Sequence, residues 1–244
     1  MNKQIELDQI KKAFDDLGYS ISDHQTLQFH RYYELLVETN NVMNLTAITE
    51  FSEVLTKHFV DSCVLMKIKD LNQCQSLIDI GTGAGFPGIP LKILFPHLNV
   101  TLLDSLNKRI RFLEQVVNEL GLEKVELLHG RAEDYAHQKK YREQYDLCVS
   151  RAVANLSTLS EYCIPYVKKN GYFIPYKSGK LDEELNQAEY AIKQLGCVTE
   201  KSEKMILPST DIERMFVFIH KINITAAKYP RKAGMPSKEP LEKK

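Results

Sequence analysis

The sequence predicts an α/β fold built on a mostly parallel, doubly wound sheet of seven strands, one of which runs antiparallel. Two patterns carry this prediction. From about residue 75 onward, short apolar runs alternate with longer amphipathic segments, as in parallel strands joined by crossover helices. The last two runs, 197–206 and 214–222, are joined by a link with no room for a helix, so they must pair antiparallel. We expect the antiparallel strand at an edge of the sheet.

The same alternation predicts the other elements of this region. The expected strands are 77–80, 99–104, 125–129, 145–150 and 171–177. The expected helices are about 106–120, 156–166 and 182–195, and Gly121 and Gly196 follow the first and last of them, as is typical after a helix. A turn is expected over 168–171, and the last 15 residues have a loop-like composition.

The N-terminal part of the chain has a helical pattern without strands. One amphipathic helix is expected over 2–17, and a second is expected to begin after Ser22 or Asp23. Two short helices should follow. We therefore divide the chain into an N-terminal helical cap (1–70), a Rossmann-like domain (71–224) and a basic C-terminal tail (225–244).

Charge and cysteine usage limit the classes of protein. The formal net charge is zero, but residues 221–244 hold seven Lys or Arg against two Glu, which indicates either a polyanionic partner or a solvated terminus. The five cysteines are widely spaced and form no C-x-x-C pair, so we expect neither disulfides nor a metal site. Without a signal peptide or an apolar run of about 18 residues, we expect a cytoplasmic protein that avoids membranes, and we take it to be a monomer.

The most informative segment is the glycine-rich stretch after the first strand. Gly81, Gly83 and Gly85 follow that strand, and the chain resumes as a helix near Pro87. Glycines allow the backbone to approach a ligand that a Cβ atom would exclude, and a helix start presents unpaired N–H groups. This combination predicts a cofactor site.

Two cofactors fit this stretch. Gly83, Gly85 and Gly88 match the dinucleotide pattern G-x-G-x-x-G, with Asp104 at the distance of a ribose ligand, which would indicate an NAD-dependent dehydrogenase. However, the strand ends before Gly81, so the turn itself is Gly81-x-Gly83-x-Gly85, and Gly88 belongs to the helix. That shorter turn is typical of S-adenosyl-L-methionine sites. The final antiparallel pair is likewise typical of class I methyltransferases, whereas a nicotinamide domain would continue with another crossover helix.

Carboxylates follow the next two strands. Asp104 ends the second strand, where its two oxygens can accept from both ribose hydroxyls; alternatively, it caps the following helix. The segment 130–134 follows the third strand, and an acidic group there suits the adenine edge of the same ligand. The alternative for Glu133 and Asp134 is a first-turn carboxylate favoured by the helix dipole.

The end of the fourth strand carries the reacting group in this architecture, and here it reads Ser150-Arg-Ala-Val153. It lacks the Asn/Asp-Pro-Pro-aromatic corner that is typical of enzymes that methylate exocyclic amines. Methylation of a pyrimidine carbon needs a cysteine nucleophile, and we expect Cys163 to be a core residue instead. The guanine N7 needs neither device, because its lone pair lies in the ring plane and no proton must be removed. Arg151 could bind the guanine edge or the cofactor carboxylate; alternatively, it forms an ion pair that fastens the loop.

Several segments together resemble the family of ribosomal small-subunit methyltransferase G, also called glucose-inhibited division protein B. The resemblance extends over nearly the whole chain. Its motifs are Asn44–Thr46, Lys57–Ser62, Asp79–Gly88, Asp104–Phe112, Arg131–Glu133, Ser150–Ala154 and Tyr229–Lys238.

The resemblance implies N7-methylation of one guanine of bacterial 16S rRNA with S-adenosyl-L-methionine, and hence the small ribosomal subunit or its rRNA as partner. It also implies that Gly81 and Phe86 line the cofactor, that Ala132 and Glu133 hold its adenine side, and that Arg151 closes the site. A third hypothesis is a non-catalytic ribosome-assembly factor that binds RNA through the same fold.

Basic residues supply the expected RNA contacts, through their phosphate affinity. They are Lys108, Arg109, Arg111, Lys177, Lys180, Arg231, Lys232 and Lys238. For Lys108 and Arg109 a solvated helix start is the alternative.

Overall fold

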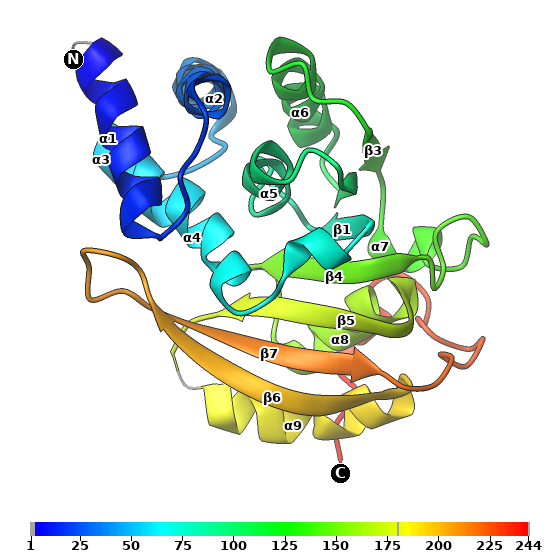
Figure 1. Cartoon of the computed structure of the whole chain (residues 1–244). Coiled ribbons are helices and arrows are strands. Elements are labelled where there is room, and N and C mark those ends of the chain that lie inside the picture. Colours follow the sequence, from blue (N-terminus) through cyan, green and yellow to red (C-terminus); the bar gives the residue numbers. More distant parts are fainter. Residues whose placement is uncertain (1–2, 180, 244) are drawn as a thin grey trace.

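The computed structural model describes residues 3–179 and 181–243, which form one seven-stranded sheet with helices on both faces (Figure 1). The strands are β1 (Ser76–Ile80), β2 (Asn99–Asp104), β3 (Val125–His129), β4 (Tyr145–Arg151), β5 (Val167–Lys177), β6 (Cys197–Ile206) and β7 (Glu213–Lys221). Their order is β3-β2-β1-β4-β5-β7-β6. Neighbours are parallel except where β7 pairs with β5 and β6. The prediction of a mostly parallel sheet with one antiparallel strand is confirmed.

The helices begin and end close to the predicted positions. They are α1 (Lys3–Asp16), α2 (Asp23–Met43), α3 (Phe51–Val54), η1 (Leu55–Val60), α4 (Asp61–Cys63), η2 (Val64–Lys67), η3 (Leu71–Gln73), α5 (Gly88–Leu94), α6 (Asn107–Glu119), α7 (Ala132–Tyr135), α8 (Leu156–Cys163), η4 (Ile164–Tyr166), α9 (Leu181–Gln194) and α10 (Met235–Lys238). Ser22 starts α2 as a capping box, because its hydroxyl accepts from the Gln25 amide and the Gln25 side chain accepts from the Ser22 amide. Gly121, with φ +60°, follows α6.

Alternation along the strands divides the core into two clusters, one on each face of the sheet. Leu77, Leu147 and Val149 belong to the cluster that includes α1, α2, α5 and α6. Ile78 and Cys148 belong to the cluster that includes α8 and α9. The N-terminal helices therefore share a continuous hydrophobic core with the sheet.

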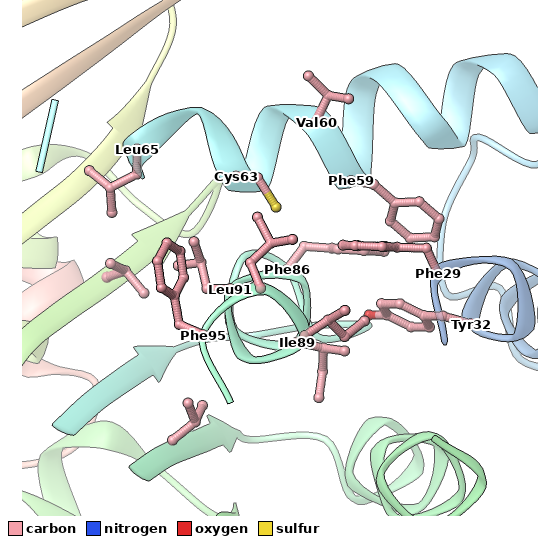
Figure 2. Packing of buried hydrophobic residues seen from close by; sticks show 14 of the residues in the cluster. Phe29, Tyr32, Phe59, Val60, Cys63, Leu65, Phe86, Ile89, Leu91 and Phe95 are labelled. Atoms are coloured by element: carbon pink, nitrogen blue, oxygen red, sulfur yellow. The ribbon is translucent and has the colours of Figure 1, made fainter. Parts of the chain in front are cut away.

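Aromatic side chains join the N-terminal helices to the glycine-rich segment (Figure 2). Tyr32 of α2 stacks between Phe59 of η1 and Phe86, with ring centroids 5.3 and 5.4 Å apart. The Tyr32 hydroxyl also donates a hydrogen bond to the Ala84 carbonyl. The N-terminal helices thus pack directly on the glycine-rich turn, and Tyr32 holds the backbone of that turn in place.

Two expectations about the sheet are wrong. The reversed strand is β7, and it lies inside the sheet, while β6 forms the edge. The physical reason is composition: β6 is mostly exposed and rich in Glu and Lys, as edge strands are, whereas Phe216–Ile219 of β7 is apolar and buried. The expected turn at 168–171 is instead part of β5, where Asn170 has φ +67° and the pairing with β4 shifts register between Tyr145 and Leu147.

Candidate functional site

The glycine turn follows β1, and its amides donate hydrogen bonds to the carboxyl end of the neighbouring strand β2. The amides of Gly81 and Thr82 donate to the Leu103 carbonyl of β2, at 2.8 and 3.2 Å. The Gly83 amide donates to Asp104 Oδ2 at 2.9 Å. All three glycines of the turn have positive φ, between +64° and +100°, which side chains with a Cβ rarely adopt.

The glycines of this turn serve different purposes. A Cβ on Gly83 would meet no atom within 4 Å, so this position faces open space. A Cβ on Gly85 would lie 2.6 Å from the Tyr32 hydroxyl and 2.8 Å from Ile89 Cγ1, so this position is needed for core packing. At Gly81 the added atom would meet Val153 Cγ2 at 2.6 Å, because the loop after β4 crosses the turn there.

Two adjoining cavities border the turn. The first, of ≈370 Å³, is lined by Gly81, Gly83, Phe86, Asp104, Arg109 and Arg151, among others. The second, of ≈260 Å³, is lined by Gly81, Ala132 and Glu133, with Tyr162 and Ser237 opposite. Gly81, Ser105 and Val153 contribute to both cavities. We call them the turn cavity and the α7 cavity; between them they include eight of the residues predicted to bind cofactor or RNA.

Asp104 is buried, and each of its carboxylate oxygens has a hydrogen-bond partner within the chain. Its Oδ2 accepts from Gly83 at 2.9 Å and from Arg109 Nη1 at 3.1 Å, while Oδ1 accepts from the Leu106 amide at 2.9 Å. The N-cap role that we considered as the alternative is wrong, because the N-cap residue of α6 is Leu106 and no side chain in the described part of the chain caps this helix. Asp104 therefore fastens the glycine turn to the start of α6, and its contact with a ribose stays a prediction.

The residues of α7 connect the C-terminal segment to the α7 cavity. Glu133 is buried, and its Oε1 accepts from the Gly234 amide at 2.8 Å. The Ala132 carbonyl accepts from the Tyr166 hydroxyl at 2.6 Å. The C-terminal segment is mostly irregular, as its composition predicted, but it is docked here and contains the short helix α10.

Arg151 forms the ion pair that we considered as its alternative role. Its Nη1 donates to Asp61 Oδ2 at 2.9 Å and to the Lys57 carbonyl at 3.0 Å. Its guanidinium also lies 5.2 Å from the centre of the Phe86 ring. The side chain still lines the turn cavity, so fastening the loop and contacting a ligand are compatible.

The carboxylate that holds this arginine, Asp61, was not predicted as a site residue from the sequence. Asp61 is 1% exposed and binds a second arginine, Arg214, at 2.8 Å through Oδ1 and 3.0 Å through Oδ2. The three charges surround a further cavity of ≈450 Å³, which Glu184 and Lys177 also line. The motif Lys57–Ser62 contained Asp61, but nothing in the local sequence around Arg214 or Glu184 indicated a site.

Two titratable groups near the turn have displaced pKa values. Burial, assisted by the Arg151 cation, lowers the pKa of His58 to about 4, so its imidazole is neutral. This ring stacks on Phe86 at 4.6 Å. Burial raises the pKa of the Asp79 carboxyl to about 7, although Thr82 and Gly88 donate hydrogen bonds to its Oδ2. Its Oδ1 has no hydrogen-bond partner among the described residues.

Four of the eight basic residues predicted to contact RNA have partners within the chain, and one of these is Arg109, which pairs with Asp104. Lys108 donates to the Met43 carbonyl, and Lys177 pairs with Glu184 at 2.5 Å. Arg231 forms a bidentate pair with the buried Glu161. Arg111, Lys232 and Lys238 are exposed, and Lys180 lies outside the described residues. Contact of these residues with RNA stays a prediction.

Neither a membrane span nor a metal centre is found in the described residues. No helix within 3–179 and 181–243 combines the length and apolarity needed to cross a bilayer. The same residues contain no group of three or more His, Cys, Asp or Glu side chains able to hold a metal ion.

Comparison with known proteins agrees with this geometry. Residues 25–212 match the model of a family described as GidB, rRNA small subunit methyltransferase G. The chain is 54% identical over 228 residues to ribosomal RNA small subunit methyltransferase G of Lachnoclostridium phytofermentans, covering 93% of this chain and 94% of the relative. The corresponding protein of Alkaliphilus metalliredigens is 49% identical and is covered to 98%.

A solved structure shares the fold at low sequence identity. TrmN from Thermus thermophilus superposes with a TM-score of 0.52 at 14% identity, covering 69% of this chain and 53% of that one. This likeness concerns the fold alone. The fold is that of class I methyltransferases, and the chain belongs to the family of rRNA small subunit methyltransferase G.

Proposed function

We propose that the protein transfers a methyl group from S-adenosyl-L-methionine to N7 of one guanine of bacterial 16S rRNA, in the cytoplasm. Membership of the methyltransferase G family supports rRNA as substrate. The observation that carries the proposal is the pair of adjoining cavities at the carboxyl ends of β1, β2 and β3, which is where class I sheets bind their cofactor. The dehydrogenase alternative is wrong, because the family is a methyltransferase family and β7 reverses the sheet.

The residues present fit the cofactor. Gly83 leaves open space where any Cβ would project, and Asp104 supplies a carboxylate at the end of β2. In this proposal the ribose and methionine parts occupy the turn cavity, and the adenine occupies the α7 cavity beside Ala132 and Glu133. S-adenosyl-L-methionine supplies an electrophilic methyl group when it is bound.

The surrounding residues suit a nucleophile that needs no base. Cys163, the cysteine that we considered as a nucleophile, is fully buried in α8. His58, with a pKa of about 4, is neutral and forms part of the wall of the turn cavity. The N7 lone pair forms the new N–C bond while the methyl–sulfur bond breaks and its electron pair stays on sulfur. No proton moves, so positioning is the main task of the protein.

Mapping of methyl groups on rRNA tests this proposal. Unmodified 16S rRNA and small subunits lacking the modification are incubated with the protein and S-adenosyl-L-methionine, and nucleosides are identified by mass spectrometry. We expect one 7-methylguanosine, and none with Gly81→Val, whose side chain would collide with Val153 and fill the turn. Methylation at another atom would refute the N7 assignment. Binding of rRNA without turnover would favour the assembly-factor hypothesis.

A further inference from the structure

The cavity around Asp61, Arg151 and Arg214 continues the turn cavity toward β5. It lies beside the carboxyl ends of β4 and β5, next to the switch point of the sheet, and has a volume of ≈450 Å³. That size falls within the range of roughly 300–1,000 Å³ found for small-molecule sites. His58, Arg151 and Ala152 line both cavities, so a group placed here borders the turn cavity directly. We call it the β5 cavity.

One carboxylate in the β5 cavity remains available to a ligand. Both oxygens of Asp61 are bound by arginines. Glu184 accepts from Lys177 Nζ at 2.5 Å through Oε1, and its Oε2 has no hydrogen-bond partner within residues 3–179 and 181–243. Lys177 is itself held by the Ala154 carbonyl at 2.8 Å, so the position of Glu184 is fixed from the end of β5.

The other charged groups of this cavity are cationic. Lys57, Arg151 and Arg214 line it together with Lys177, and Lys57 also pairs with Glu53, so four cations are set against the three carboxylates Asp61, Glu184 and Glu53. This balance attracts an anionic nucleotide, while Glu184 offers an acceptor to hydrogen-bond donors. A ligand that combines phosphates with a donor edge on its base therefore fits the cavity.

We propose that the β5 cavity receives the acceptor guanine and that Glu184 accepts hydrogen bonds from its N1–H and N2–H groups. This inference rests on the proposed function. N1 belongs to the six-membered ring, N2 is the amine attached to that ring, and N7 belongs to the five-membered ring, so a base held through N1 and N2 can present N7 toward the turn cavity. Adenine carries an acceptor at N1, which would face the carboxylate and be repelled, whereas the pyrimidines have no N7.

The carboxylate also suits the charge change of the reaction. Methylation at N7 moves the positive charge from sulfur to the purine ring. A fixed anion at the far edge of that ring stabilises the charge as it develops, because its interaction is stronger in the transition state than with neutral guanine. Glu184 is therefore expected to affect turnover as well as base selection.

The experiment uses the full-length protein and unmodified 16S rRNA carrying either guanosine or inosine at the methylated position. Inosine keeps N1–H, O6 and N7 but lacks the N2 amine. For the wild type we expect kcat/KM to fall about 10-fold with inosine, as for the loss of one good base-edge contact. For Glu184→Gln we expect kcat/KM with guanosine to fall about 10- to 100-fold, partly through kcat, and inosine to cost little more.

The matched control is Glu183→Gln, which changes the exposed neighbouring carboxylate on the same helix and should leave both substrates unaffected. Calorimetric affinity for S-adenosyl-L-methionine should be unchanged in both variants, which separates base recognition from misfolding. Glu184→Asp should recover part of the lost selectivity. If Glu184→Gln retains wild-type kcat/KM and wild-type discrimination against inosine, the role of Glu184 is refuted while the proposed function stands. If the wild type methylates no guanine, both are refuted.

Discussion

The turn cavity and the β5 cavity adjoin each other but are built in different ways. Half of the residues that line the turn cavity come from residues 81–86, Asp104 and Ser105, which are close in the sequence, and the others come from 45–46, His58, Arg109 and 151–153. The β5 cavity is formed by charged side chains from widely separated segments, and Asp61 and Arg214 are 153 positions apart. A short motif thus supplies much of the proposed cofactor site, whereas the proposed acceptor site is assembled from residues spread along the chain.

The largest expected effect concerns Asp61, which holds both arginines of the β5 cavity. Asp61→Ala would leave Arg151 and Arg214 without their anionic partner in a mostly buried position. We expect the free energy of unfolding in urea to fall by about 3–5 kcal/mol. Asp211→Ala, at an exposed aspartate between β6 and β7, is the control and should change it by less than about 0.5 kcal/mol. A similar small loss for both variants would show that the ion pairs do not hold the site together.

The next effect is a dependence of the free energy of unfolding on pH, caused by the buried Asp79. The pKa of Asp79, beneath the glycine turn, is raised to about 7, so the folded protein binds its proton more tightly than the unfolded chain. The contribution of Asp79 to stability is therefore fully present below its ordinary pKa of 3.8 and is lost as pH rises through about 7. Asn has no carboxyl group to ionise. As the pH rises from 3.8 to about 7, the free energy of unfolding of Asp79→Asn should therefore increase relative to that of the wild type by on the order of 2–4 kcal/mol.

Urea unfolding of both proteins at a series of pH values measures this difference. His58 has the opposite sign, because its lowered pKa of about 4 adds stability that is present above 6.5 and lost as pH falls through about 4. Since His58 is common to both proteins, it cancels in the comparison. A difference that does not vary with pH would contradict the assignment to Asp79.

Substitutions at Gly85, which faces the core, and at Gly83, which faces open space, should have intermediate effects on stability. Gly85→Ala places a methyl group against Tyr32, Ile89 and Leu113 at a φ of +100°, and we expect it to cost about 2–3 kcal/mol of stability. Gly83→Ala meets no neighbour and should cost about 1 kcal/mol, from its φ of +64°. By calorimetry, Gly83→Ala should nevertheless weaken S-adenosyl-L-methionine binding more than Gly85→Ala does. Equal losses of affinity would mean that Gly83 does not face the cofactor.

The smallest effect concerns the exposed lysines of the C-terminal segment. Lys232→Ala and Lys238→Ala should each reduce the salt dependence of rRNA binding by a slope of about 0.7–0.9, the value for one phosphate contact, without altering cofactor affinity. Anisotropy of a labelled rRNA fragment at several salt concentrations measures the slope. Arg231→Ala is unsuitable for this purpose, because it would leave the buried Glu161 carboxylate without its partner. Unchanged slopes would assign both lysines to a solvated surface.

Helices and strands whose bounds depend on the local sequence were predicted well. The strands 99–104 and 125–129 have the predicted bounds, and the helix before Gly121 ends within about one turn of the prediction. The polar composition of β6 and the apolar composition of β7 also indicate that β6 is the edge strand. By contrast, the partners of Arg151 and Arg231 lie 90 and 70 positions away, and no periodicity reports a contact that depends on tertiary packing.

The hydrogen bond that the Gly234 amide donates to Glu133 joins the C-terminal segment to the α7 cavity. Ser237 forms part of the wall of the α7 cavity, and the Pro236 carbonyl is anchored by the Thr158 hydroxyl at 3.0 Å. Residues around 234–237 thus form part of the wall of the α7 cavity, the compartment that we propose for the adenine. In the proposed arrangement, docking of this segment and binding of the nucleoside would therefore be linked, so that each favours the other.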